Sequence, residues 1–142
     1  MTHKLWTLSK VDIRASVAPT GWPVARVELH HGERGRVTDV ASAPGALEGA
    51  FAAVSQIMDM PARVDSLDMQ YAAAGSEDAA AGGQGATVVV AMTIAARGEI
   101  FAGRACSRDI LTACVSAYID AAGKARAASD LRQANRGKVD AQ

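Results

Sequence analysis

Several features that mark particular classes of protein are scarce or absent in the sequence. Its 15 basic and 15 acidic side chains cancel to a formal net charge of zero, so no field draws nucleic acid or an anionic membrane to the chain. No stretch approaches the about 20 apolar residues of a membrane span, and residues 1–10 contain no apolar run of signal-peptide length. We therefore expect a cytoplasmic protein with no nucleic-acid partner and no membrane partner.

Cysteine is also scarce. Cys106 and Cys114 fall on one predicted helix and its start, too far apart along the helix axis to form a disulfide. We expect two free thiols, which suits a reducing compartment. No spacing of Cys and His matches a zinc site, and the Gly-rich stretch 75–85 lacks the Lys and the Ser or Thr of a phosphate-binding loop. No metal or other cofactor is expected.

The length excludes two common enzyme scaffolds. A chain of 142 residues can bury one core, whereas a (β/α)8 barrel needs about 250 residues and a six-stranded doubly wound fold would also be cramped. A single small domain follows.

Strands are predicted in the first half by apolar residues that alternate with polar ones. Residues 11–17 show this period-2 pattern, and the Pro- and Gly-containing segment 18–23 then turns the chain. Two further strands are expected at 25–30 and 36–41, joined by a turn at 32–35. The three strands would form antiparallel hairpins.

A helix is predicted next, because apolar residues from Leu47 to Met58 recur at steps of three and four. Ser42 can cap its start, and Pro44 suits its first turn. Glu48 favours the positive end of the helix dipole, and Pro61 prevents continuation.

The second half repeats this plan. Residues 66–71 alternate as a strand, and 72–85 is an Ala- and Gly-rich loop. A β-prone strand at 87–96, a turn at 97–98 and a returning strand at 99–105 follow. Ser107 is expected to open a second helix that Gly123 ends. The helix would turn inward Ile110, Leu111, Cys114, Ala117, Tyr118 and Ala121.

A shift of 63 residues brings the two halves into register without a gap, which indicates an internal duplication. The shift superposes the hairpin turns and the buried helix positions together. It aligns Val27 with Val90, Leu29 with Met92, Arg34-Gly35 with Arg97-Gly98, Val37 with Ile100, Leu47 with Ile110, and Ala50 with Ala113.

These patterns predict an α+β fold of two β-β-α or β-β-β-α repeats, at about 11–60 and 64–123, related by a pseudo-twofold axis. Antiparallel hairpins would pack on two helices. The domain is expected to span residues 1–125, and the polar tail 126–142 to be partly disordered, extending the helix at most to about Asn135.

Short motifs in order carry a family resemblance. Residues 43–49 read Ala-Pro-Gly-Ala-Leu-Glu-Gly, and the second half contains Asp78-Ala79, a β-rich strand, Gly103, Ser107-Arg108-Asp109-Ile110 and Ala117-Tyr118. From Val24 to Ala125 the chain resembles the C-terminal regulatory domain of α-isopropylmalate synthase and citramalate synthase. That family has a G-x-G-P-V-D-A-like loop, of which Gly45 is kept, and an S-x-D-I element that opens the second helix.

In that family the domain adjoins a catalytic barrel, dimerises, and binds leucine or isoleucine between its repeats. The resemblance implies a homodimeric ligand-binding module without synthase activity, with a separate catalytic subunit as a second candidate partner. A carboxylate-bearing ligand would rest on free N–H groups at the two loop-to-helix junctions, formed by Ser42, Ala43, Pro44 and Gly45 and by Cys106, Ser107 and Asp109. Ala43 and Ala46 replace a family glycine and proline, which would narrow the pocket for leucine.

The chain also contains candidate catalytic side chains: His30, Cys106 and Asp109. Cys106 precedes a helix N-terminus that can lower a thiol pKa, although a small buried residue is the commoner role of a free cysteine. His30 and His31 adjoin Glu33, but consecutive strand residues point to opposite faces, which favours a solvated turn over a shared site. Asp109 would either orient a ligand ammonium group or pair with the helix dipole.

Two classes of function follow. The first is a homodimeric regulatory or accessory module that holds an amino-acid-like or acyl ligand and is not an enzyme on its own. The second is a small enzyme of hydrolase or cyclase type that reuses the fold, with its site at the seam between the repeats. A third interpretation is a scaffold that assembles through exposed strand edges.

Overall fold

The computed structural model describes residues 6–15, 21–72 and 87–140, in which a β-β-β-α unit occurs twice in series. The first copy comprises β1 (Trp6–Arg14), β2 (Val24–His31), β3 (Gly35–Ser42) and α1 (Ala46–Met58). The second comprises β4 (Arg63–Ala72), β5 (Thr87–Ala96), β6 (Glu99–Ser107) and α2 (Ile110–Asp140). The predicted α+β class with two repeats is confirmed.

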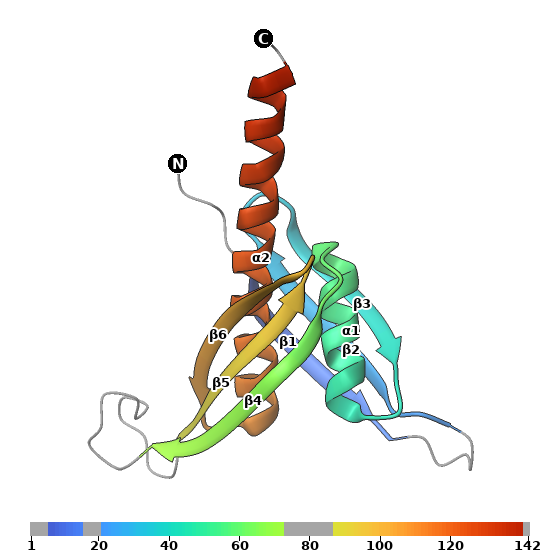
Figure 1. Ribbon diagram of the computed structural model, residues 1–142. Coiled ribbons are helices and arrows are strands. Elements are labelled where there is room, and N and C mark those ends of the chain that lie inside the picture. The colour runs from blue at the N-terminus through green and yellow to red at the C-terminus, as the bar shows by residue number, and fades with distance from the viewer. Residues whose placement is uncertain (1–5, 16–20, 73–86, 141–142) are drawn as a thin grey trace.

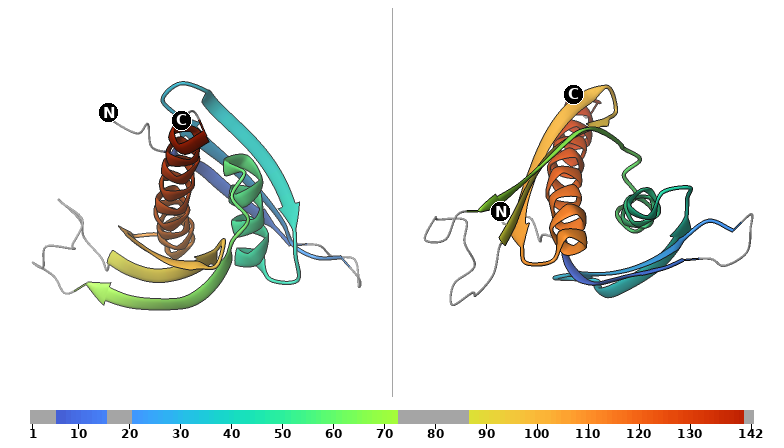
Figure 2. Two further views of the ribbon diagram at one scale, coloured as in Figure 1. Left: turned by 45° about the horizontal axis from the view of Figure 1, so that its top comes forward. Right: turned by 90° about the horizontal axis from the view of Figure 1, so that it is seen from below.

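Each copy forms its own three-stranded antiparallel sheet, which we call sheet A (β1-β2-β3) and sheet B (β4-β5-β6). Both helices lie between the sheets and run in the same direction, so that their N-termini lie at one end of the molecule (Figures 1 and 2). The helix α1 packs on β2 and β3, whereas α2 packs on β5 and β6 and also on β1 of the other copy. The two sheets diverge towards the end where the helices begin (Figure 1).

The constant shift of 63 residues holds for the central strands but not for the last ones. Val27 and Leu29 of β2 and their counterparts Val90 and Met92 of β5 are all buried. Val37 lies opposite Leu29 on the inner face, but the residue opposite Met92 is Gly103 and not Ile100, which is exposed. The expected match of Val37 with Ile100 is therefore wrong.

The turn lengths explain the difference. In sheet A three residues, 32–34, separate the paired His31 and Gly35. In sheet B a two-residue turn, Arg97-Gly98, separates Ala96 and Glu99, and both of its residues have positive φ (52° and 79°). Two successive positive φ angles are the geometry of the type I′ hairpin, which matches the twist of the strands. A one-residue change in turn length exchanges the faces of the returning strand.

The first strand begins earlier than predicted. β1 covers Trp6–Arg14, where the sequence suggested 11–17, and residues 16 and 17 lie outside the described part of the chain. β4 extends the predicted 66–71 in both directions, and β5 matches the predicted 87–96 at both ends. The predicted loop at 72–85 lies almost wholly outside the described residues.

The second helix is much longer than predicted. α2 continues through Gly123 to Asp140, so Gly123 does not end it, and residues 126–140 of the expected tail are helical. Gly123 has open space around it, with nothing within 4 Å of the position a Cβ would take, and its backbone stays in the helix. Among the described residues no helix combines the length and the apolarity that crossing a bilayer requires.

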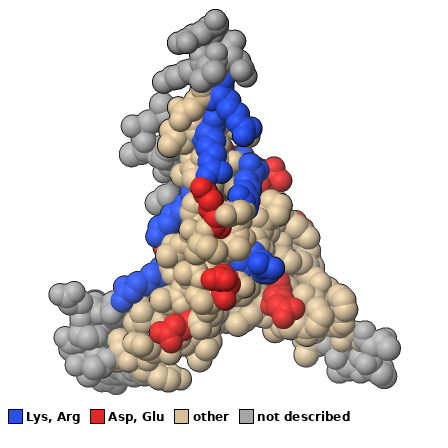
Figure 3. Space-filling view, in the orientation of Figure 1, with Lys and Arg blue, Asp and Glu red and all other residues tan. Residues whose placement is uncertain are grey.

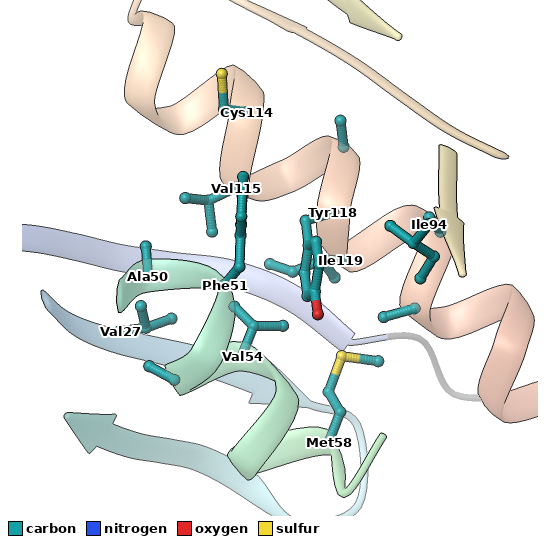
Figure 4. Close-up of a cluster of buried hydrophobic side chains, with 14 of the residues drawn as sticks. Val27, Ala50, Phe51, Val54, Met58, Ile94, Cys114, Val115, Tyr118 and Ile119 are labelled. Carbon is teal, nitrogen blue, oxygen red and sulfur yellow. The ribbon is translucent and has the colours of Figure 1, made fainter. Parts of the chain in front are cut away.

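The helices meet through a small aromatic cluster at the centre of the core (Figure 4). The rings of Phe51 on α1 and Tyr118 on α2 stack at 4.6 Å between centroids with an interplanar angle of 15°. The Tyr118 hydroxyl and the Ser55 hydroxyl share a hydrogen bond of 2.5 Å. Burial raises the pKa of the Tyr118 phenol, with the Ser55 hydrogen bond acting in the opposite direction, so the hydroxyl stays protonated at neutral pH.

Basic side chains gather along the C-terminal half of α2 (Figure 3), and two of them tie it to the rest of the domain. Arg126 donates hydrogen bonds to the carbonyls of Met58 and Asp59, each at 3.2 Å, and so satisfies the C-terminus of α1. Arg132 pairs with Glu99 at the β5–β6 turn. The helical extension is thus docked on the domain as far as Arg132.

The outer edge of β6 is covered by α2. The Arg104 N–H donates to the Asp120 carboxylate (3.0 Å), and the Ala102 carbonyl accepts a hydrogen bond from Lys124 Nζ (2.7 Å). Asp120 and Lys124 also pair with each other at 3.7 Å along one helix face. Because open sheet edges invite pairing with other chains, this arrangement blocks strand addition at β6.

Candidate functional site

The two loop-to-helix junctions predicted to hold a ligand lie at the same end of the molecule (Figure 1). They follow strands of different sheets, β3 of sheet A and β6 of sheet B. Their local geometry differs in a way that bears on ligand binding, because one helix start is capped by a side chain and the other is not.

The start of α1 carries no side-chain cap. Its N-cap residue is Gly45, and the first helical hydrogen bond runs from the Gly49 N–H to the Gly45 carbonyl at 3.1 Å. The predicted cap Ser42 is the last residue of β3, and its hydroxyl donates instead to the Pro23 carbonyl at 3.0 Å. The expectation that Ser42 caps the helix is wrong, because the strand continues to it and the chain needs three more residues to enter the helix.

The carboxylate of Glu48 folds back over the start of α1. A Cβ added at Gly45 would lie 3.2 Å from Glu48 Cδ and 3.3 Å from Glu48 Oε1. The first turn therefore presents N–H groups of residues 46–48 beside one acidic side chain, which places a hydrogen-bond donor surface next to a negative charge.

The start of α2 is capped by the chain itself. The Asp109 carboxylate accepts hydrogen bonds from the Thr112 hydroxyl (2.6 Å) and the Thr112 N–H (2.9 Å), and these bonds hold the pKa of Asp109 below its usual value. The Ser107 hydroxyl accepts the Asp109 N–H at 3.2 Å. The sequence left two roles open for Asp109, to orient a ligand ammonium group or to pair with the helix dipole. The structure shows the second, because Asp109 caps the N-terminus of α2.

Replacement of Asp109 by Ala should lower the free energy of unfolding by about 1 kcal/mol, the usual cost of losing an N-cap carboxylate. Because the folded-state pKa of Asp109 is depressed, its contribution is present above the ordinary Asp pKa and disappears as pH falls through the folded-state value. Urea unfolding of both proteins at neutral and at acidic pH measures this difference. A gap between the two that does not shrink on acidification would contradict the cap.

Cys106 differs from expectation. It lies in β6 opposite Val89, on the outer face of sheet B, and it is exposed, so its interpretation as a small buried residue is wrong. It also precedes the first residue of α2 by four positions, which removes it from the helix N-terminus. Cys114 is fully buried, as predicted. Its burial, and to a smaller extent the negative charge of Asp109, raise the pKa of its thiol.

The two thiols should therefore differ sharply towards an alkylating reagent. In the native protein at pH 8 we expect iodoacetamide to modify Cys106 and to leave Cys114 unmodified until urea is added. Mass spectrometry of tryptic peptides locates the label, and Cys106→Ser should abolish the native-state reaction. Rapid labelling of Cys114 in the folded protein would show that the core opens readily.

The candidate catalytic residues are not assembled into one site. His30 is exposed on β2 of sheet A, whereas Cys106 and Asp109 belong to sheet B and the start of α2. His31 points to the other face from His30, and its Nδ1 accepts the N–H groups of Glu33 and Arg34 at 3.2 and 3.3 Å. That histidine serves the turn, in agreement with the solvated-turn interpretation.

A groove lies at the seam between the repeats, where a site was expected for the small-enzyme alternative, but other residues than the predicted ones line it. It has a volume of about 1150 Å³, and its walls are the β1 stretch from Trp6 to Val11 and a face of α2. The α2 residues at this face are Thr112, Ser116, Ile119, Asp120, Gly123, Lys124, Arg126, Ala127 and Asp130. None of the predicted ligand residues lines this groove. The groove and the two loop-to-helix junctions are therefore different places in the structure.

Two β-β-β-α units with their helices enclosed between two sheets define a duplicated α+β domain. A sequence model of the LeuA allosteric (dimerisation) domain matches residues 2–125, and the chain belongs to this family. A search of curated proteins finds no match to the chain. The match ends at Ala125, within α2, which continues to Asp140.

Proposed function

We propose that the chain is a self-associating regulatory module that binds a small amino-acid-like ligand at the start of α1. The observation that carries this proposal is the missing side-chain cap at Gly45, which leaves the first-turn N–H groups available to an external carboxylate. Membership of an allosteric, dimerising family supports both parts of the proposal. The synthase reaction lies outside these 142 residues, which are too few for a (β/α)8 barrel of about 250 residues.

The chemistry at α1 suits a zwitterion. A ligand carboxylate would accept hydrogen bonds from the N–H groups of residues 46–48, and the ligand ammonium group would lie towards the Glu48 carboxylate beside Gly45. The α2 junction is a poorer site for a ligand carboxylate. The Asp109 carboxylate already accepts the Thr112 N–H there, and its negative charge would repel a second carboxylate. Ala43, which replaces a glycine of the family pattern, adds a Cβ and so narrows the space for the ligand.

Thermal-shift and calorimetric titration with branched-chain amino acids and with their 2-keto and 2-hydroxy analogues tests this function. A ligand that binds only the native state stabilises it by RT ln(1 + [L]/Kd), so the melting temperature rises with the logarithm of ligand concentration above the Kd. Glu48→Gln should weaken amino-acid binding about tenfold and leave the 2-hydroxy acids nearly unaffected, because only the amino acid carries a cation.

The matched control is Asp109→Asn, which removes the corresponding charge from the other helix start and keeps a capping side chain. It should leave amino-acid affinity unchanged. An affinity that responds to Asp109→Asn and not to Glu48→Gln would move the site to α2. If no compound in the panel stabilises the protein, the ligand-binding function is refuted.

A further inference from the structure

One inner surface of the domain has no helix or strand packed over it among the residues that the structure describes. In β4, Leu67, Met69 and Tyr71 lie directly opposite Met92, Val90 and Val88 of β5, so they face inward with them. The three β5 residues are at most 3% exposed, yet Met69 is 47% exposed and Tyr71 is 70% exposed. We call these three β4 residues the β4 inner face.

The corresponding strand of the first repeat is covered. Val11 and Ile13 of β1 lie opposite Val27 and Ala25, are half-buried, and have α2 packed against their strand. On β4, Met69 reaches Cys114 of α2 with a sulfur–sulfur distance of 3.9 Å. Beyond Met69 the strand diverges from both helices (Figure 2). The second repeat therefore lacks the helical cover that the first repeat receives from its neighbour.

Pairing with a strand of another chain is disfavoured at three of the four edge strands, β1, β4 and β6. The edge of β6 is capped by Asp120 and Lys124, and the first strands β1 and β4 each contain a register irregularity, after Leu8 and after Val64. Bulges in edge strands discourage pairing with other chains. An apolar face, in contrast, stays open, and an exposed Tyr beside an exposed Met is the composition that protein interfaces favour.

We propose that the β4 inner face is a docking surface for a second copy of this chain. The family to which the chain belongs is a dimerisation domain, which makes a second copy the occupant, and an uncharged apolar face is complementary to itself across a twofold axis. This inference rests on the self-association in the proposed function. β4 ends at the side of the molecule where both helices begin, close to the start of α2 (Figure 1).

Sedimentation of the full chain over a dilution series tests the surface. Tyr71→Glu should weaken association at least tenfold, because a charge would be buried at the contact. Gln70→Glu is the matched control: it adds the same charge one residue away on the opposite face of β4 and should associate as the unmodified chain does. Circular dichroism and the melting temperature of a dilute sample verify folding, and Tyr71→Ser is a second variant without an added charge.

The outcomes separate this surface from the proposed function. A chain that dimerises equally well with Tyr71→Glu and with Tyr71→Ser overturns the surface, while ligand binding and dimerisation stand. A chain that is monomeric at every concentration overturns both the surface and self-association. Loss of association in Tyr71→Glu together with normal association in Gln70→Glu supports the surface, whatever the amino-acid titration shows.

Discussion

Replacement of Gly103 by Ala should destabilise the domain more than any other substitution of one hydrogen by a methyl group. A Cβ at Gly103 would lie 2.7 Å from the Ala121 nitrogen and 2.8 Å from the Ala121 Cβ, and still closer to the Ala117 carbonyl oxygen. These atoms belong largely to the backbone of α2, which cannot move without separating the helix from sheet B. We expect a loss of about 3 kcal/mol, at the upper end of overpacking costs, measured by urea unfolding.

The control is Gly123→Ala, a substitution within α2 itself. Nothing lies within 4 Å of a Cβ at Gly123, so the substitution should raise the free energy of unfolding by about 0.5–1 kcal/mol, the usual gain from replacing a helical glycine. Equal effects at the two glycines would contradict the close packing of β6 against α2 at Gly103.

The second large effect is expected at Tyr118. Tyr118→Ala removes the ring that stacks on Phe51 and leaves a cavity between the two helices, at a cost of about 3–5 kcal/mol. Tyr118→Phe keeps the ring and loses only the hydrogen bond to Ser55, at a cost of about 1 kcal/mol. Thermal and urea unfolding of the two variants separate packing from hydrogen bonding.

A double-mutant cycle with Ser55→Ala tests the hydrogen bond itself. If the bond is the whole coupling, adding Ser55→Ala to Tyr118→Phe should cost little more than Tyr118→Phe alone. Fully additive losses would indicate that the two hydroxyls do not interact in solution.

Much of the architecture could be predicted from local patterns. The alternation in β5 located that strand at both ends, and the shared patterning at one shift indicated the duplication before any coordinates. The shift failed at Ile100 because it took the two turns to be equal in length, and a turn shorter by one residue reverses which side chains face the core. Gly123 suggested the end of a helix, but α2 continues beyond this residue, and no neighbouring atoms crowd it.

The site was less accessible to prediction. Capping was assigned to Ser42 from its residue type, whereas the hydroxyl found a nearer partner in Pro23, which only the pairing of β2 with β3 brings close. Asp109 was found as a candidate, and its role follows from Thr112 three residues later, a spacing that the sequence does contain. The groove beside β1 had no sequence signal, because a strand edge and a helix face from different repeats form it.

The contact between Ser55 and Tyr118 joins two positions that are 63 residues apart, which is the spacing of the repeat itself. A position that touches its own counterpart must sit on the axis relating the copies. In an ancestor made of two identical chains, that position would have met an identical residue, so a hydroxyl-bearing serine would have faced serine and a tyrosine would have faced tyrosine. Joining the copies into one chain lets each side change separately, and the pairing of a small side chain with a large one is a packing that two identical chains could not form on their axis.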